Sequence, residues 1–217
     1  GVHLGLYDVD QPEEDHFLIY DSSLKYFIDM TKRHINIQKI DGGKATSPIK
    51  FVGTPISATF DSKNGYLVVY DSYQTILIYK IDQNGELVDS FVSGPEIKDL
   101  GTIQAGDISS GGKLVLSVRG APQTATGVGV DALVLIDIAA TLADQNTESK
   151  LIYEKVDTTL TEMSWIAPVN GSDNLVMIRS LGKISLFDLV AKTATSLPTD
   201  DWVVEKYSKI KDGHIVL

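Results

Sequence analysis

A pair of short apolar segments joined by a polar turn recurs along this sequence, and this repeat constrains the fold more than any other feature. In the clearest copy, residues 65–71 form the first segment and residues 75–82 form the second. The same pair recurs at residues 26–29 with 34–41, 113–117 with 132–138, and 174–178 with 183–189, and a further first segment starts at residue 214. Short runs rich in Val, Ile, Leu and Tyr, bounded by turn residues, are typical of β-strands.

The turns between the predicted strands carry the residue types that tight hairpins need. The dipeptides concerned are Asn64-Gly65, Asn84-Gly85, Gly111-Gly112, Asn170-Gly171 and Asp212-Gly213. Glycine and asparagine accept the positive φ that two-residue hairpin turns require. No segment has a convincing helical period, and the best candidate, residues 139–144, is short. The sequence therefore predicts antiparallel strands joined by hairpins.

Each strand pair is flanked by a further predicted strand on either side. The flanking strands are residues 17–21, 56–61, 103–108, 163–167 and 203–207 before the pairs, and 49–52, 87–92, 151–156 and 193–197 after them. A four-stranded meander repeated every 40 to 60 residues, roughly, is the signature of a propeller blade. We predict an all-β protein, a β-propeller of about five four-stranded blades, formed by a single domain over residues 1–217.

The two ends of the chain are predicted to complete one blade between them. Residues 2–10 have the pattern of a third blade strand, and residues 214–217 have that of a second blade strand. Pairing them would close the ring by strand exchange between the N- and C-termini and would remove exposed sheet edges. The alternative is that this chain is a fragment of a larger propeller of six to eight blades. Both alternatives stay open at this point.

The composition limits the partners and cofactors of this protein. With 19 Lys and Arg against 29 Asp and Glu, the net charge is −10, which disfavours a nucleic-acid partner. No apolar run is long enough to span a membrane. The chain has no cysteine, and its four histidines are not spaced as zinc ligands. We therefore expect no cofactor and no bound metal.

The segment 66–82 resembles the repeat of bacterial YVTN-type and lactonase-like propellers. In those repeats the second strand of a blade ends in a small polar residue, and the third strand ends near an acidic one. The resemblance extends over residues 17–200 as a pattern. It implies a propeller fold and an extracytoplasmic bacterial setting (periplasmic, cell-surface or secreted). It implies no particular activity, because a fold hosts many functions.

The candidate binding residues lie in loops that a propeller gathers on one face. In propellers, the loops between second and third strands share a face with the connections between blades, and binding residues are often found in such loops. A Gly- and Thr-rich insertion, residues 119–131, falls in one of these loops. The candidates are Arg33, Asp71, Tyr73, Arg119, Asp131, Arg179 and Trp202.

These residue types suggest two kinds of contact. Arg119 and Arg179, at the ends of second strands in neighbouring blades, either bind a carboxylate or sulfate together or form salt bridges between blades. Tyr73 and Trp202 lie beside acidic residues and suit stacking on a sugar or anchoring in a protein partner. Tyr70 and Trp165 are expected to pack inside the fold instead.

Three functions are compatible with this pattern, and the sequence favours the first. The first is a non-enzymatic propeller that presents loops to a protein or glycan partner. The alternative is a lactonase-like or glycoside-type hydrolase with an acidic, metal-assisted site at the channel mouth. It would need two carboxylates about 5–10 Å apart, with Asp107 and Glu162 as candidates. The third is a structural domain of a larger surface protein.

Overall fold

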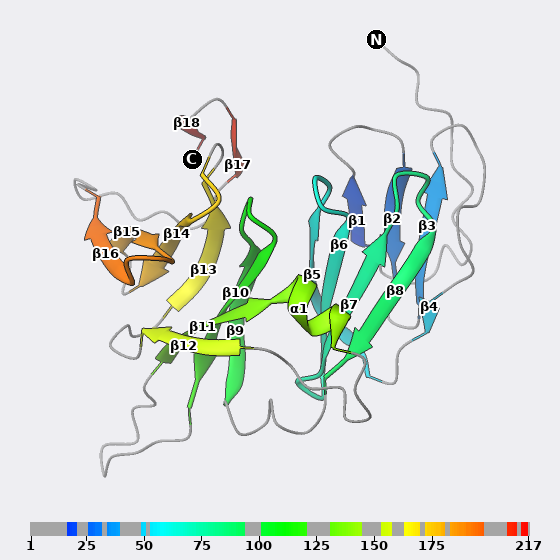
Figure 1. Cartoon of the computed structure of the whole chain (residues 1–217), viewed down its shortest axis with the longest axis horizontal. Helices are drawn as coiled ribbons and strands as arrows, with labels where there is room; N and C mark the ends of the chain where they lie inside the picture. Colours follow the sequence, from blue (N-terminus) through cyan, green and yellow to red (C-terminus); the bar gives the residue numbers. More distant parts are fainter. Residues whose placement is uncertain are drawn as a thin grey trace. The chain divides into compact units, whose positions relative to one another are not determined.

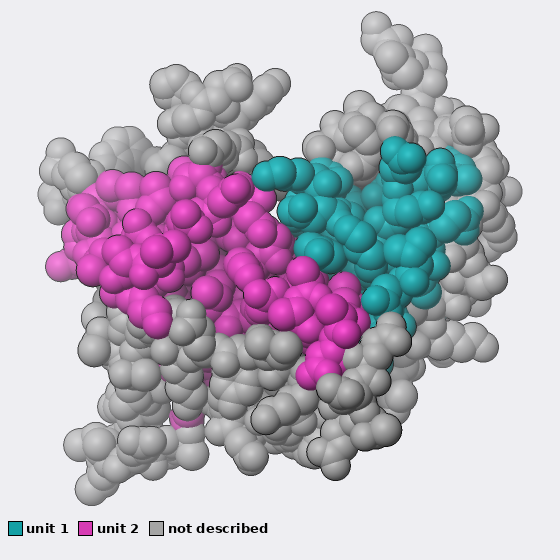
Figure 2. Space-filling view, in the orientation of Figure 1, with its two compact units in different colours: residues 1–92 teal, residues 93–217 magenta. Residues whose placement is uncertain are grey.

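The structure, a computed structural model, describes residues 17–20, 26–31, 34–39, 49–50, 53–93, 101–120, 131–144, 153–157, 163–169, 172–180, 183–197, 208–211 and 214–216. In these residues it is an all-β protein of antiparallel strands with one short helix (Figure 1). The chain forms two compact units, residues 1–92 and residues 93–217 (Figure 2). Each unit is described by itself.

The first unit holds two four-stranded antiparallel sheets, and each follows the chain order without a crossover. One sheet consists of β1 (Phe17–Tyr20), β2 (Tyr26–Met30), β3 (His34–Lys39) and β4 (Ile49–Lys50). The other consists of β5 (Pro55–Asp61), β6 (Tyr66–Asp71), β7 (Ile76–Ile81) and β8 (Leu87–Val92). Both are the meander that the repeat predicts for a blade.

The core of the first unit lies between these two sheets. Side chains alternate between the two faces of a strand, so residues two apart along β6 and β7 point the same way. Ten buried side chains from the two sheets form one cluster. They are Tyr26, Ile28, Met30, Ile35 and Ile37 of the first sheet and Leu67, Val69, Leu77, Tyr79 and Ile81 of the second. Each fully buried aliphatic side chain contributes about 1.5–3 kcal/mol.

The second unit repeats the arrangement with two more four-stranded antiparallel sheets and a separate hairpin. The first sheet is β9 (Thr102–Ile108), β10 (Lys113–Arg119), β11 (Asp131–Asp137) and β12 (Tyr153–Asp157). The second is β13 (Met163–Pro168), β14 (Leu175–Ser180), β15 (Lys183–Asp188) and β16 (Thr193–Ser196). The hairpin pairs β17 (Ser208–Lys211) with β18 (His214–Val216).

A second apolar cluster joins these two sheets. Val115 and Leu133 of the first sheet pack with buried side chains of the second sheet and of its β15–β16 turn. The partners are Ile166, Val176, Ile178, Phe187 and Leu189. The helix α1 (Ile138–Ala143) follows β11 directly, and the Asp137 side chain caps it by accepting from the Ala140 amide at 2.9 Å.

Acidic and hydroxyl side chains at strand ends close the hairpin turns. Asp82 accepts from the amides of Asn84 and Glu86, both at 2.8 Å. The Glu86 amide is the main reason that the pKa of Asp82 lies below its usual value, although burial acts in the opposite direction. Asp61 and Asp188 accept from turn amides in the same way, and so do the hydroxyls of Ser109 and Ser172. Such local caps stabilise tight turns.

The predicted strands are confirmed with small shifts at their ends, and two predictions are corrected. The strand that pairs with β18 is β17, Ser208–Lys211, and not residues 203–207. The reason is that the Asp212-Gly213 turn leaves only two residues between the strands, so the first strand must end immediately before it. The short segment near residues 139–144, predicted as a loop, forms α1.

Two predictions about the whole molecule are untested by these sheets. The blade count and the single ring over residues 1–217 depend on how the two units are placed, and residues 2–10 of the predicted strand exchange lie outside the described residues. The all-β prediction itself, with repeated four-stranded meanders, is confirmed.

Candidate functional site

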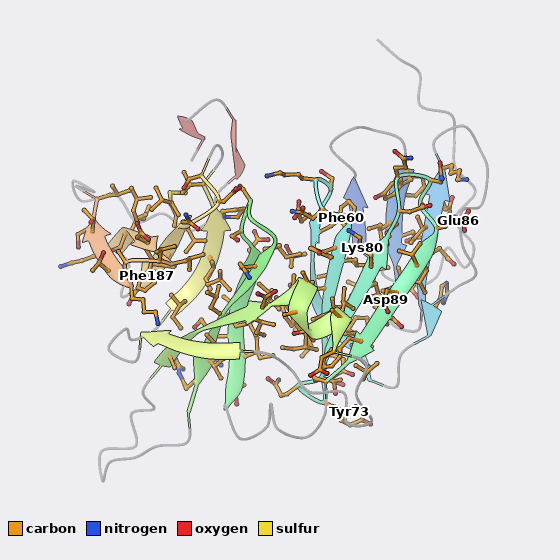
Figure 3. The ribbon with its side chains drawn as sticks, in the orientation of Figure 1. Phe60, Tyr73, Lys80, Glu86, Asp89 and Phe187 are labelled. Carbon is orange, nitrogen blue, oxygen red and sulfur yellow. The ribbon has the colours of Figure 1, made fainter. Side chains whose placement is uncertain are left out.

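The turn between β6 and β7, residues 71–75, is the predicted binding loop that the structure describes completely. It brings together two candidates with opposite exposure, because Asp71 is 2% exposed and Tyr73 is 59% exposed. Figure 3 shows Tyr73 at one end of the β5–β8 sheet. Two sets of contacts hold the turn that carries this exposed ring.

The Asp71 carboxylate closes this turn from inside. Its Oδ1 accepts from the amide of Tyr73 at 3.0 Å and from that of Thr75 at 2.9 Å. The backbone carbonyl of Asp71 accepts from the Gln74 amide at 3.0 Å, and Gln74 adopts a φ of 61°. These contacts explain why an acid is buried here, since a carboxylate that accepts backbone amides is satisfied without solvent. The predicted role of Asp71 in binding a ligand stays a prediction.

A second segment, Gly53 and Thr54, clamps the turn from the side. The Ser72 amide donates to the Thr54 carbonyl at 2.7 Å, and the Thr54 amide donates to the Ser72 hydroxyl at 3.1 Å. A Cβ added to Gly53 would lie 2.6 Å from Oδ2 of Asp71 and 2.9 Å from Cδ2 of Tyr73. Only glycine leaves room for both side chains. The Tyr73 ring therefore lies close beside Gly53.

The residues around Tyr73 in these two segments are uncharged. Neither residues 53–57 nor residues 72–76 include an acidic or basic residue, although the chain carries a net charge of −10. Thr54, Ser57 and Ser72 are exposed, and Ile56 is as exposed as Tyr73. The turn and residues 53–57 together thus present an aromatic ring, an aliphatic side chain and hydroxyl groups to solvent.

The charge of Asp71 also acts on the core behind the turn. Burial, and after it the negative charge of Asp71, raise the pKa of the Tyr79 phenol to about 12. The phenol is therefore neutral at physiological pH. Tyr70, on the same strand as Asp71, is buried, which confirms its predicted packing role.

Arg119 and Arg179 belong to the two neighbouring sheets of the second unit. Arg119 ends β10 and pairs with Asp131, and it lies on the face of Val115, which packs against the β13–β16 sheet. Arg179 follows Ile178, which belongs to that same packed face, so Arg179 points to the opposite face with Met177. A shared anion site for the two arginines stays a prediction.

The other predicted site residues lie mostly outside the described part of the chain. Arg33, Trp202, Glu162 and residues 121–130 of the insertion belong to this group, as do the side chains of Asp131 and Trp165. Asp107 lies in β9, where its Oδ1 accepts from the Ile108 amide at 2.8 Å. Among the described residues, no group of three or more His, Cys, Asp and Glu is placed to hold a metal ion. No described helix has the length and apolar character needed to cross a membrane.

Sequence reasoning missed the contribution of Gly53, Thr54 and Ile56. Residues 53–55 form one of the connections between blades that a propeller gathers on the face of the β6–β7 turn, but nothing in the sequence links Gly53 to Asp71. The close approach of these residues arises only when β5 pairs with β6, with Pro55 opposite Asp71. The one available signal was the Gly-Thr-Pro run itself, which marks a turn.

Comparison with known proteins supports the propeller fold alone. No protein-family profile matches the chain, and no curated protein sequence is similar to it. Among solved structures, the chain is similar to the Dos1 propeller, with a TM-score of 0.52 and 11% sequence identity over 88% of this chain. The chain covers 48% of that protein chain, so it spans about half its length. The YVTN-type resemblance is not confirmed by these comparisons and stays a prediction.

Proposed function

We propose that this protein is a non-enzymatic propeller scaffold that presents loops to a protein or glycan partner. The observation that carries the proposal is the 59% exposure of Tyr73 on a turn that is held from two sides. A preordered loop loses little conformational entropy on binding, so more of its contact energy is available for affinity. Exposed tyrosines are frequent anchors in binding surfaces because they combine a large apolar ring with a polar tip.

The proposed scaffold is a ring of about five blades, closed by strand exchange between residues 2–10 and 214–217. Four meanders of four strands and the β17–β18 hairpin support this number, and the similarity to the Dos1 propeller supports the fold class. The candidate loops, with Arg33, Arg119, Arg179 and Trp202, would then share a face with the Tyr73 turn. We place the protein outside the bacterial cytoplasm on the strength of the YVTN-type repeat pattern of residues 66–82.

The net charge of −10 supports a partner other than nucleic acid. The hydrolase alternative requires converging carboxylates. No observation in the described residues favours it.

The test measures which components the immobilised protein retains. Wild-type protein, Tyr73→Ala and Val190→Ala are exposed to a bacterial envelope extract and to a glycan array. Val190 is a suitable control because it is an exposed apolar residue, at 70%, in a turn of the other unit. We expect wild type and Val190→Ala to retain the same component and Tyr73→Ala to lose it.

Two results would contradict this function. Equal retention by wild type and Tyr73→Ala would remove the Tyr73 turn as the binding site. Hydrolysis of a lactone or glycoside that depends on a divalent cation would show that the protein is an enzyme.

A further inference from the structure

The support beneath Tyr73 indicates what kind of ligand its ring can accept. Cδ2 of the ring lies 2.9 Å from the position that a Cβ on Gly53 would occupy, so the ring lies close beside Gly53, in space that a side chain there would take up. The Tyr73 amide is held by Asp71 at 3.0 Å, which limits movement of the residue. With 59% of the residue exposed, the turn presents a ring in a defined position to solvent. Such a ring is a stacking platform.

Neutral hydrogen-bonding groups border this platform. The Ser72 hydroxyl accepts from the Thr54 amide at 3.1 Å, which leaves its own proton and a further lone pair for a ligand. The exposed Thr54 adds a second hydroxyl beside it. An apolar ring with adjacent hydroxyls matches a sugar, which has an apolar face of C–H groups and a rim of hydroxyls.

The charge of the turn selects between neutral and acidic sugars. Residues 53–57 and 72–76 contain no Lys or Arg to bind a carboxylate or sulfate, and the chain as a whole is strongly acidic. An anionic sugar would therefore be repelled at long range and would find no cation in these segments. A protein partner would need a larger apolar centre than one aromatic and one aliphatic side chain.

We propose that the Tyr73 turn binds neutral glycans, with one hexose stacked on the Tyr73 ring and its hydroxyls bonded to Ser72 and Thr54. This inference rests on the proposed function and specifies the ligand class for the same turn. A single stacked sugar binds weakly, so oligosaccharides and multivalent presentation are required for high affinity. Binding should be insensitive to salt, because no charged group of the turn takes part.

The experiment uses the full chain and a panel of neutral hexaoses made of glucose, galactose or mannose, with an acidic hyaluronan oligosaccharide as the charged comparison. Affinity is measured by calorimetry for wild type, Tyr73→Ala, Tyr73→Phe and Val190→Ala. We expect at least one neutral hexaose to bind wild type, Tyr73→Phe within about threefold, and Tyr73→Ala about tenfold or more weaker, a change equivalent to about 1.4 kcal/mol. Thermal midpoints of all variants show whether each is folded.

The inference is overturned if no neutral hexaose binds, if hyaluronan binds best, or if a folded Tyr73→Ala binds as wild type does.

A second measurement separates this failure from failure of the proposed function. The component retained from the envelope extract is treated with periodate, which destroys sugar rings, and is then offered again. Retention that depends on Tyr73 but survives periodate means a protein partner, so the proposed function holds and the glycan inference fails. Retention lost after periodate supports the glycan inference.

Discussion

At the scale of the residue, acidic side chains in this protein serve first as caps of hairpin turns. Asp71 and Asp82 each accept from two backbone amides at the ends of β6 and β7. They differ in burial, because Asp71 is buried and Asp82 is partly exposed. A buried turn that loses its cap cannot replace the lost hydrogen bonds with water, whereas an exposed turn can. The two caps should therefore contribute unequally to the stability of the fold.

Replacing Asp71 should therefore destabilise the fold more than replacing Asp82. We expect Asp71→Ala to lower the free energy of unfolding by about 1–3 kcal/mol, because the amides of Tyr73 and Thr75 lose their buried acceptor. Asp82→Ala should give a smaller loss, because water replaces the carboxylate. Urea unfolding of the two variants beside wild type measures both values. Equal losses would show that burial of Asp71 does not matter for its role.

The raised pKa of Tyr79 predicts a loss of stability in alkali. The unfolded phenol ionises near pH 10, whereas the folded phenol has a pKa of about 12. Above pH 10 the unfolded state releases a proton that the folded state keeps, so stability is complete below pH 10 and falls as the pH rises toward 12. The loss should reach about 2–3 kcal/mol for a shift of this size.

The control for this prediction is Tyr79→Phe, which has no phenol to ionise. Unfolding of wild type and Tyr79→Phe is measured by urea at several values between pH 9 and pH 12. The stability of wild type relative to Tyr79→Phe should fall as the pH rises over this range. A difference that stays constant with pH would mean that Tyr79 ionises equally easily in both states.

At the scale of the element, each hairpin is built locally, but the binding turn is completed by a neighbouring strand. The β6–β7 turn contains its own cap, whereas its lateral support comes from residues 53 and 54, just before β5. The pairing of β5 with β6 is therefore what positions Tyr73. The role of Gly53 in this turn therefore cannot be inferred from its own segment of the sequence.

Substitution of Gly53 tests this dependence. We expect Gly53→Ala to destabilise the protein by about 1–3 kcal/mol, since the new methyl group would overlap Asp71 and Tyr73 and force them apart. Thr54→Ala is the matched control, because Thr54 contributes its backbone groups to the clamp and its side chain is exposed. That variant should stay within about 0.5 kcal/mol of wild type. A fully stable Gly53→Ala would contradict the close packing of the turn.

At the scale of the whole molecule, the open question is closure of the ring. The described sheets are four meanders of four strands, and among the described residues the β17–β18 hairpin follows the fourth of them. A propeller is stabilised when its last blade is completed, because this pairs the remaining sheet edges. Strand exchange between the ends is the predicted way to complete it.

Deletion of the two ends tests this closure. Removal of residues 1–10 and removal of residues 214–217 should each lower the thermal midpoint by about 5 °C or more. The double deletion should cost little more than either deletion alone, because the two segments stabilise the fold through the same pairing. Scanning calorimetry of the three variants gives the comparison. Additive losses, or no loss from residues 1–10, would rule out the strand exchange.

The sequence by itself determined the strands, the hairpins and the all-β class of this protein. These features depend on local chemistry, namely the short apolar runs along 26–30 and 66–71 and the turn preference of Asn64-Gly65 and Asn84-Gly85. The exact partner of β18 was predicted wrongly, because the region before Asp212 carries two possible strand segments and only pairing selects between them.

The tertiary structure alone decided which candidate residues serve the surface and which serve the fold. Pairing of β5 with β6 brought Thr54 to Ser72, 18 positions away in the chain, and buried Asp71 beneath Tyr73. The register of β10 and β14 placed Arg119 on the side of its sheet that packs against the β13–β16 sheet, and Arg179 on the side of its own sheet away from Ile178. Exposure and proximity depend on which strands pair and which face is covered, and these are long-range properties that no local pattern encodes.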